Sequence, residues 1–248
     1  MAETTIRFDI GAAYEQAMGV WSRFAGEVFL EWLAPIAWLA MGRCRLWQRC
    51  VAPADAQGVD PSEAQLVVAR ERPEARAATF QVGDAMALPF PDERFDVIFF
   101  VPNPAKGLAE MVRVVRPGGM VAAYAWDMLG GSFPFAPLQA EVQALVITPP
   151  QPPSAAVSGM NAPRDLWADG GFEAIETREI TVQRTFADFD DFWAKSTATG
   201  TIRQILAELG PAEEEKFKQR VRARLPADAM GRITYASRAN SVKGRVPG

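Results

Sequence analysis

The region between residues 54 and 126 alternates between short apolar segments and segments of helical character, and this alternation restricts the fold more than any other feature. Extended segments are expected at 54–59, 78–82, 95–101 and 120–126, with helices at about 62–71 and 104–116. The third extended segment, FDVIFFV, is almost entirely apolar, as is typical of a strand that is buried on both faces. Strands that alternate with helices predict an α/β fold with a doubly wound, mostly parallel sheet.

Outside residues 54–126, extended and helical segments alternate less regularly. Apolar residues recur at three- or four-residue steps over 12–33, which predicts an amphipathic helical arm. This arm could pack on the core or cover a small-molecule pocket, and both roles are compatible with the pattern. After residue 127 we expect a proline-rich loop at 148–159, a helix at 163–168, a strand at 173–182, helices at 186–195 and 201–225, and a last strand at 235–246.

The composition excludes several classes of protein. The chain has 248 residues, no histidine and two cysteines, so histidine-based catalysis is excluded and no metal site is expected. The net charge of -4 gives no basic footprint for nucleic acid. The arginines at 220, 222 and 224 follow three glutamates at 213–215, which is typical of a solvated helix face. The N-terminus carries acids and no apolar signal core, no stretch is long and apolar enough to span a membrane, and we expect a cytoplasmic protein.

Four motifs then occur in a family-specific order. GVDPSE at 58–63, VGDAMALPFPDERFD at 82–96, LAEMVRVVRPGGMVAAYAWD at 108–127 and the later GGFEAIETREI follow the successive strands. Together they resemble the class I S-adenosylmethionine-dependent methyltransferases, and most closely the type 11 group, which is related to the enzymes of quinone biosynthesis. The resemblance implies a Rossmann-like methyltransferase fold in one domain over 1–248. It divides into a helical arm (1–35), a cofactor-binding half (36–127) and substrate-side helices with the final strands (128–248).

The resemblance also implies which residues contact S-adenosyl-L-methionine. Asp60 would accept both ribose hydroxyls, although it could instead only cap the following helix, as could Ser62. Asp84 would accept from the adenine amino group, with the Ala85 N–H facing a ring nitrogen and Met86 packing on the ring; Asp84 could also simply be part of a tight turn. The full set of expected cofactor-binding residues is Asp60, Ser62, Asp84, Ala85, Met86 and Val101.

The segment before these motifs departs from the family pattern. A hydrophobic-x-D-x-G-x-G-x-G motif is expected roughly 20 residues before the ribose-binding acid, but Trp38–Cys50 reads WLAMGRCRLWQRC. Codons can be chosen for Met41–Cys50 that give W-V-D-V-G-C-G-N-G when they are read one base later, which suggests a frameshift. The alternative is a divergent helix with a basic face. Either way, we expect the first strand to be distorted or missing and the affinity for the cofactor to be low.

Three functions remain open. The first is methyl transfer to a small-molecule acceptor, impaired by the altered glycine-rich segment. The second is a catalytically inactive homologue that acts as a binding or interaction protein. The third, a nicotinamide-dependent oxidoreductase, does not explain the GDAMALPF and RPGG segments. The sequence does not select a general base among its Asp, Glu and Tyr residues, and it leaves the acceptor and the oligomeric state open.

Overall fold

The computed structural model describes residues 15–33, 56–72, 78–95, 104–145, 153–198 and 200–248. Five strands are present in this part of the chain: β1 (Gln57–Asp60), β2 (Thr79–Val82), β3 (Met120–Trp126), β4 (Glu173–Phe186) and β5 (Ile233–Arg245). The helices are η1 (Glu15–Gly19), α2 (Val20–Leu33), α4 (Glu63–Arg70), α5 (Pro104–Val114), α6 (Ala136–Ala144), η4 (Pro153–Val157), α7 (Asn161–Asp169), α8 (Phe189–Thr197), α9 (Gly200–Glu208) and α10 (Pro211–Arg224).

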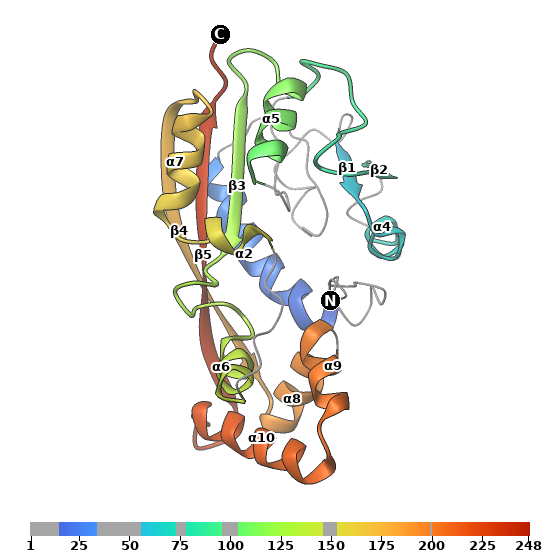
Figure 1. Cartoon of the computed structure of the whole chain (residues 1–248), viewed down its shortest axis with the longest axis vertical. Coiled ribbons are helices and arrows are strands. Elements are labelled where there is room, and N and C mark those ends of the chain that lie inside the picture. The colour runs from blue at the N-terminus through green and yellow to red at the C-terminus, as the bar shows by residue number, and fades with distance from the viewer. Residues whose placement is uncertain (1–14, 34–55, 73–77, 96–103, 146–152, 199) are drawn as a thin grey trace.

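The described strands form one parallel pair and one antiparallel sheet. β1 and β2 run parallel, with Asp60 opposite Val82. β5 lies between β3 and β4 and runs antiparallel to both, so β3 and β4 point the same way (Figure 1). The parallel pairing predicted for the first half is confirmed for β1 and β2. The antiparallel course of β5 was not predicted, because alternation of apolar residues identifies a strand but does not encode its direction.

Helices cover both faces of the three-stranded sheet, as a doubly wound fold requires. Figure 1 shows α2 and α7 on opposite sides of the sheet. On the α7 side, Trp167 and Phe172 join a core that includes Val121, Val242 and, from the parallel pair, Val59. The same core contains the apolar face of α5. This shared core connects the parallel pair to the larger sheet.

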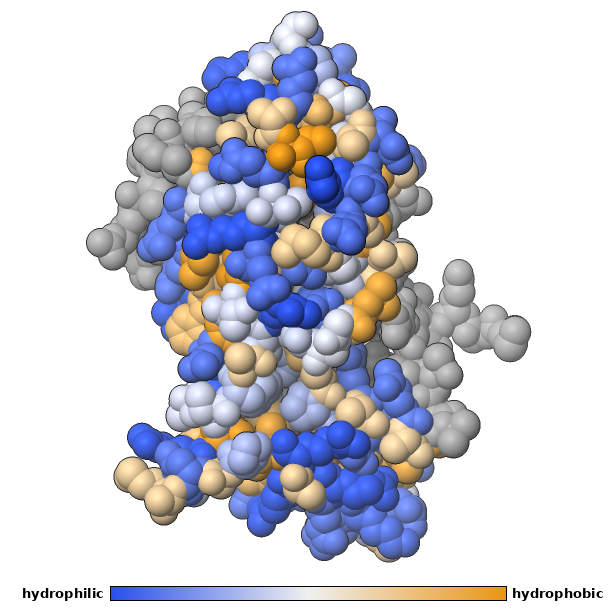
Figure 2. All heavy atoms as spheres, turned by 90° about the vertical axis from the view of Figure 1, so that its left-hand side faces the viewer, coloured by the Kyte–Doolittle hydropathy of each residue, from blue (hydrophilic) through white to orange (hydrophobic). Residues whose placement is uncertain are grey.

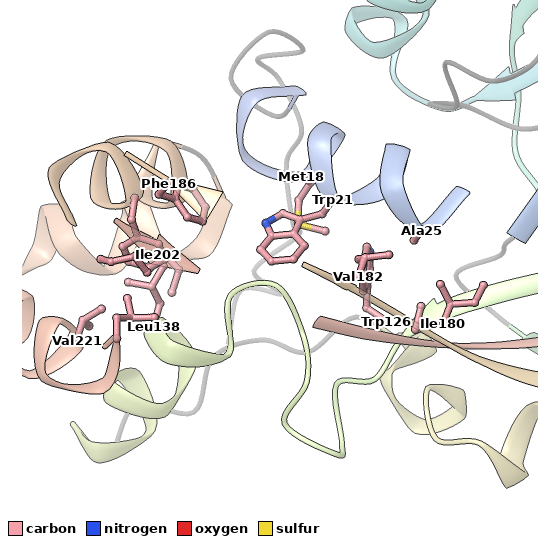
Figure 3. Close-up of a cluster of buried hydrophobic side chains, with 14 of the residues drawn as sticks. Met18, Trp21, Ala25, Trp126, Leu138, Ile180, Val182, Phe186, Ile202 and Val221 are labelled. Atoms are coloured by element: carbon pink, nitrogen blue, oxygen red, sulfur yellow. The ribbon is translucent and has the colours of Figure 1, made fainter. Parts of the chain in front are cut away.

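The N-terminal arm packs on the other face of the sheet. The Trp21 side chain is fully buried, and its ring lies 5.0 Å from that of Tyr235 and 6.4 Å from that of Trp126. Figure 3 shows this cluster continuing from α2 along the sheet to the helices that carry Leu138 and Val221. The packed arrangement predicted for the arm is therefore confirmed, whereas its role as a cover over a pocket remains a prediction.

Charged side chains fix the start of the arm from two directions. The buried guanidinium of Arg184 on β4 donates to the carbonyls of Ala17 at 2.9 Å and Gln16 at 3.0 Å. Glu15 forms an ion pair with Arg72, which follows α4, at 2.6 Å. The arm therefore connects the region after β1 with the far edge of the sheet.

The helices between β4 and β5 form a lobe at one end of the molecule, together with α6 (Figure 1). The prediction that the charged residues of α10 form a solvated helix face is only partly correct. Figure 2 shows a largely hydrophilic surface at this end, but Arg220 and Arg224 also donate to Glu141 of α6, whose side chain is only 4% exposed. The two arginines neutralise a buried carboxylate, and a pattern of charges along one helix cannot reveal such a partner.

Several element boundaries differ from the sequence-based expectation. β4 continues to Phe186, and the helix expected from there begins at Phe189. The single helical region expected at 201–225 is broken at Gly210–Pro211 into α9 and α10, because proline cannot continue a helix past its first turn. Residues 153–157 of the expected loop form a 3-10 helix. None of the helices in the described part of the chain is long and apolar enough to cross a membrane.

Candidate functional site

Asp60 ends β1 at the edge of the parallel pair. Its Oδ1 accepts a hydrogen bond from the backbone N–H of Ser62 at 2.8 Å, and its carbonyl oxygen accepts from Gly83 N–H at 3.3 Å. Ser62 is the N-cap of α4 but makes no capping hydrogen bond with its side chain. Asp60 thus supports the start of the helix, as one of the two sequence interpretations proposed. Its half-buried side chain also lies at the carboxyl end of a parallel strand, where open α/β sheets bind ligands.

Asp84 repeats this arrangement on the neighbouring strand. It follows β2 by two residues, and its Oδ1 accepts from the Met86 N–H at 2.8 Å. The Asp84 side chain is exposed, whereas Ala85 is 5% exposed. Within the described residues, no acceptor is found for the Ala85 N–H. An accessible carboxylate and a backbone donor therefore lie side by side at the edge where Asp60 ends its strand.

Gly83 allows the two strand ends to approach closely. A Cβ atom at this position would lie 2.8 Å from Cγ1 of Val59 and 3.3 Å from Cδ of Pro89. Because Val59 is 1% exposed in the core, it has little room to move away. A side chain at residue 83 would therefore push the Asp84 turn away from β1.

The loop after Asp84 is held by two side chains from α5. Arg113 donates from Nη2 to the Leu88 carbonyl at 3.0 Å and from Nη1 to the Phe90 carbonyl at 2.9 Å. Glu110 accepts from the Leu88 N–H at 2.8 Å and also pairs with Arg113. The hydrogen bond from Arg113 holds the pKa of Glu110 below its usual range, so this carboxylate stays ionised at neutral pH. Sequence reasoning missed both residues, since they lie 22 and 25 positions after Leu88.

A third acid, Asp127, follows β3 but serves a different purpose. Arg238 on β5 donates to Asp127 through both Nε and Nη2, and Asp127 Oδ1 accepts from the Gly130 N–H at 2.8 Å. The pairing with Asp127 raises the pKa of Arg238 further above its usual range. Asp127 is 3% exposed and both its carboxylate oxygens accept hydrogen bonds. It therefore fixes the turn after β3 and is poorly placed to act as a general base towards a methyl acceptor.

The two tyrosines that the structure describes are also engaged. The Tyr235 hydroxyl donates to the Pro134 carbonyl at 2.6 Å, and the Tyr124 hydroxyl donates to the Ser22 carbonyl at 3.4 Å. Burial raises the pKa of Tyr235 well above its usual range. Neither hydroxyl is placed to act as a general base, because each proton is held by a backbone oxygen.

The structure places five of the six expected cofactor-binding residues at this edge. Asp60 and Ser62 lie at the end of β1 and the start of α4, and Asp84, Ala85 and Met86 form the turn after β2. Val101, the altered glycine-rich segment at 38–50 and the strand expected before β1 lie outside the described residues. Their predicted roles therefore remain predictions.

Comparison with known proteins agrees with the motif-based resemblance. Residues 40–123 match the methyltransferase domain family. Over 121 residues the chain is 37% identical to the ubiquinone/menaquinone biosynthesis C-methyltransferase UbiE of Dinoroseobacter shibae, a match that covers 42% of this chain and 48% of that protein. Over 77 residues it is 40% identical to the phthiotriol/phenolphthiotriol dimycocerosates methyltransferase of Mycobacterium tuberculosis, which covers 29% of this chain and 28% of that protein. The chain therefore spans about half or less of the length of these methyltransferases.

Solved structures show the same fold. The YcgJ protein of Bacillus subtilis aligns with 90% of this chain and 98% of its own, at a TM-score of 0.57 and 16% identity. Phosphoethanolamine N-methyltransferase 2 of Haemonchus contortus, solved in complex with S-adenosyl-L-methionine, aligns with 96% of this chain and 56% of its own, at a TM-score of 0.52 and 18% identity. The Rossmann-like methyltransferase fold expected from the sequence is thus confirmed.

Proposed function

We propose that this chain is an S-adenosylmethionine-dependent methyltransferase that acts on a small-molecule acceptor. The observation that carries the proposal is the pair of aspartates, Asp60 and Asp84, at the carboxyl ends of two neighbouring parallel strands. The methyltransferases that match the central part of the chain support the same reaction. S-adenosylmethionine supplies a methyl group that its sulfonium already activates, so the protein mainly has to align donor and acceptor.

The described residues fit the nucleoside part of this cofactor. A carboxylate at Asp60 accepts hydrogen bonds from a ribose diol. The exposed Asp84 carboxylate can accept from an exocyclic amino group, and the Ala85 N–H beside it can donate to a ring nitrogen. Met86 is half-buried and offers a polarizable side chain for the face of the base. With Asp127, Tyr124 and Tyr235 engaged elsewhere, we assign no general base to the reaction.

The proposal predicts that each of the two acids contributes to cofactor binding. Asp60→Asn and Asp84→Asn should each weaken the binding of S-adenosylhomocysteine about tenfold or more, because a neutral amide replaces a charged acceptor. Asp165→Asn, at an exposed position on α7, is the matched control and should leave affinity unchanged. Binding should be followed by ligand-observed NMR titration, which also reads weak affinities. Equal affinities for all four proteins would exclude this site.

The segment at 38–50 favours a second candidate, an inactive homologue that acts by binding or interaction. In the sequence, Arg43, Arg45 and Arg49 fall in the segment where the family pattern has glycines, which let the backbone approach the cofactor. Cationic side chains are also electrostatically unfavourable beside a sulfonium. We therefore propose that the affinity of the chain is low, and that replacing residues 41–50 by a segment with W-V-D-V-G-C-G-N-G raises it. A chain that binds no cofactor, while the replaced chain does, would favour the second candidate. Micromolar binding by the unaltered chain would contradict the proposed impairment.

A further inference from the structure

The loop from Asp84 to Phe95 has few interactions of its own to define its shape. It contains Pro89 and Pro91, which lack an N–H, and Glu93 has a positive φ of 54°. Its internal hydrogen bonds lie mostly in the Asp84 turn, where the Ala87 N–H donates to the Asp84 carbonyl at 3.0 Å and the Met86 N–H donates to Asp84 Oδ1 at 2.8 Å; beyond that turn, the Phe90 N–H donates to the Leu88 carbonyl. After Ala87 the course of the loop therefore depends mainly on contacts from outside it.

Arg113 on α5 supplies most of these contacts. Its guanidinium donates to the Leu88 carbonyl at 3.0 Å, to the Phe90 carbonyl at 2.9 Å and to Asp92 Oδ1 at 2.7 Å. Its own carbonyl accepts from the Glu93 N–H at 3.0 Å. One residue thus holds the loop at four points, and the three contacts from its side chain require the planar, multiply donating geometry of arginine.

Glu110 completes the contact and orients the arginine. Its two carboxylate oxygens accept from Arg113 Nε at 2.9 Å and Nη2 at 2.8 Å, a bidentate pair one helical turn apart. The same carboxylate accepts from the Leu88 N–H at 2.8 Å. The Arg113 and Glu110 side chains are 32% and 20% exposed, so solvent screens this pair only in part. Leu88 is consequently bound through both its N–H and its carbonyl, four residues after Asp84.

We infer that Glu110 and Arg113 are positioning residues that hold the Asp84–Met86 turn in its place beside β1, and thereby set the selectivity of the site for the amino group of an adenine base. Neither side chain reaches the proposed base itself. They act through Leu88, whose buried side chain and two bonded backbone groups fix the direction in which the chain leaves the turn. This inference rests on the proposed function, because the base is that of the proposed cofactor.

The test compares S-adenosylhomocysteine with S-inosylhomocysteine, in which an oxo group replaces the amino group of the base. Asp84 can accept from the amino group but not from the oxo group, so the unaltered chain should prefer the adenosyl ligand by about tenfold or more. Arg113→Lys and Glu110→Gln should reduce this preference to about twofold or less. Ligand-observed NMR titration gives both affinities for each protein.

A second readout needs no ligand. Amide hydrogen exchange at Leu88 should become at least tenfold faster in Arg113→Lys and in Glu110→Gln, since its acceptor is displaced or weakened. Arg238→Lys is the matched control: Arg238 is 35% exposed and also pairs with a carboxylate through two nitrogens, but it does so at the turn after β3. The control should retain both the ligand preference and the slow exchange at Leu88.

The outcomes distinguish the two proposals. If the variants keep the full preference for the adenosyl ligand, the positioning role is wrong while the proposed function stands. If exchange at Leu88 is unchanged, the loop is not held by α5 and the inference fails on structural grounds. If the unaltered chain binds neither ligand, the proposed function fails, and the inference fails with it.

Discussion

The buried carboxylate of Glu141 gives the sharpest test of the packing between α6 and α10. The Glu141 side chain is 4% exposed, whereas those of its partners Arg220 and Arg224 are 41% and 49% exposed. Loss of the acid would therefore leave two arginines that water can reach. Loss of the arginines would instead leave a buried charge without a partner, which costs about 3–5 kcal/mol.

We therefore expect an asymmetric effect on the free energy of unfolding. The Arg220→Met and Arg224→Met pair should lower it by about 3–5 kcal/mol, since methionine preserves helix propensity and much of the stem packing. Glu141→Gln should cost only about 1–2 kcal/mol, because the amide oxygen can still accept one hydrogen bond. In the Glu141→Gln background, the same replacement of both arginines should lower the free energy of unfolding by only about 1 kcal/mol or less. Urea denaturation followed by circular dichroism at pH 7 measures all three values.

A matched control and a pH series complete this test. Lys216→Met, at an exposed ion pair on the same helix, should change stability by less than about 0.5 kcal/mol. Burial raises the pKa of Glu141, but hydrogen bonds from Arg224 and Arg220 outweigh it and hold the pKa below its usual range. The stabilising effect of Glu141 should therefore be complete above the usual pKa range of a glutamate and disappear as the pH falls through the lowered pKa. An equal cost of the arginine pair in both backgrounds would refute the reasoning.

Two further predictions concern other parts of the fold. Gly83→Ala should destabilise the chain by about 1–3 kcal/mol, because its Cβ would lie 2.8 Å from Val59 in the packed core. Gly159→Ala is the control and should be neutral or slightly stabilising, because a Cβ there would have no atom within 4 Å. Equal unfolding midpoints for the two variants would contradict this prediction. Arg184→Met should remove two hydrogen bonds to η1 and lower stability by about 1–3 kcal/mol, with faster amide exchange over residues 16–20; unchanged exchange there would show that Arg184 does not hold the arm.

Much of the α/β pattern could be read from the chain itself. The apolar alternation and the turn residues between 54 and 126 predicted β1, α4, β2, α5 and β3 close to their observed bounds. The aspartates at the ends of β1 and β2 could be identified as candidate ligands of a cofactor because strand ends in such a sheet share one edge. These features depend on neighbours within a few residues, which is the range over which periodicity and turn chemistry are informative.

The element α6 shows where this reasoning stops. The apolar residues of α6 recur at every second position and not at helical spacing, and the buried Glu141 stands where a core residue would be expected. The acid is tolerated only because arginines 79 and 83 residues away neutralise it. No local pattern contains that information, so the sequence did not predict the helix.

Tertiary structure alone decided how distant segments meet. Placing β5 between β3 and β4 brings Arg238 to Asp127, 111 residues away, and thereby turns a possible proton acceptor into a structural ion pair. The same packing brings Arg184 to a carbonyl of the N-terminal arm 167 residues earlier. The sequence by itself indicated most of the strands and helices and the acids that follow β1, β2 and β3. Their partners depend on strand order, strand direction and side-chain packing, because the free energy of those contacts exists only once the chain is folded.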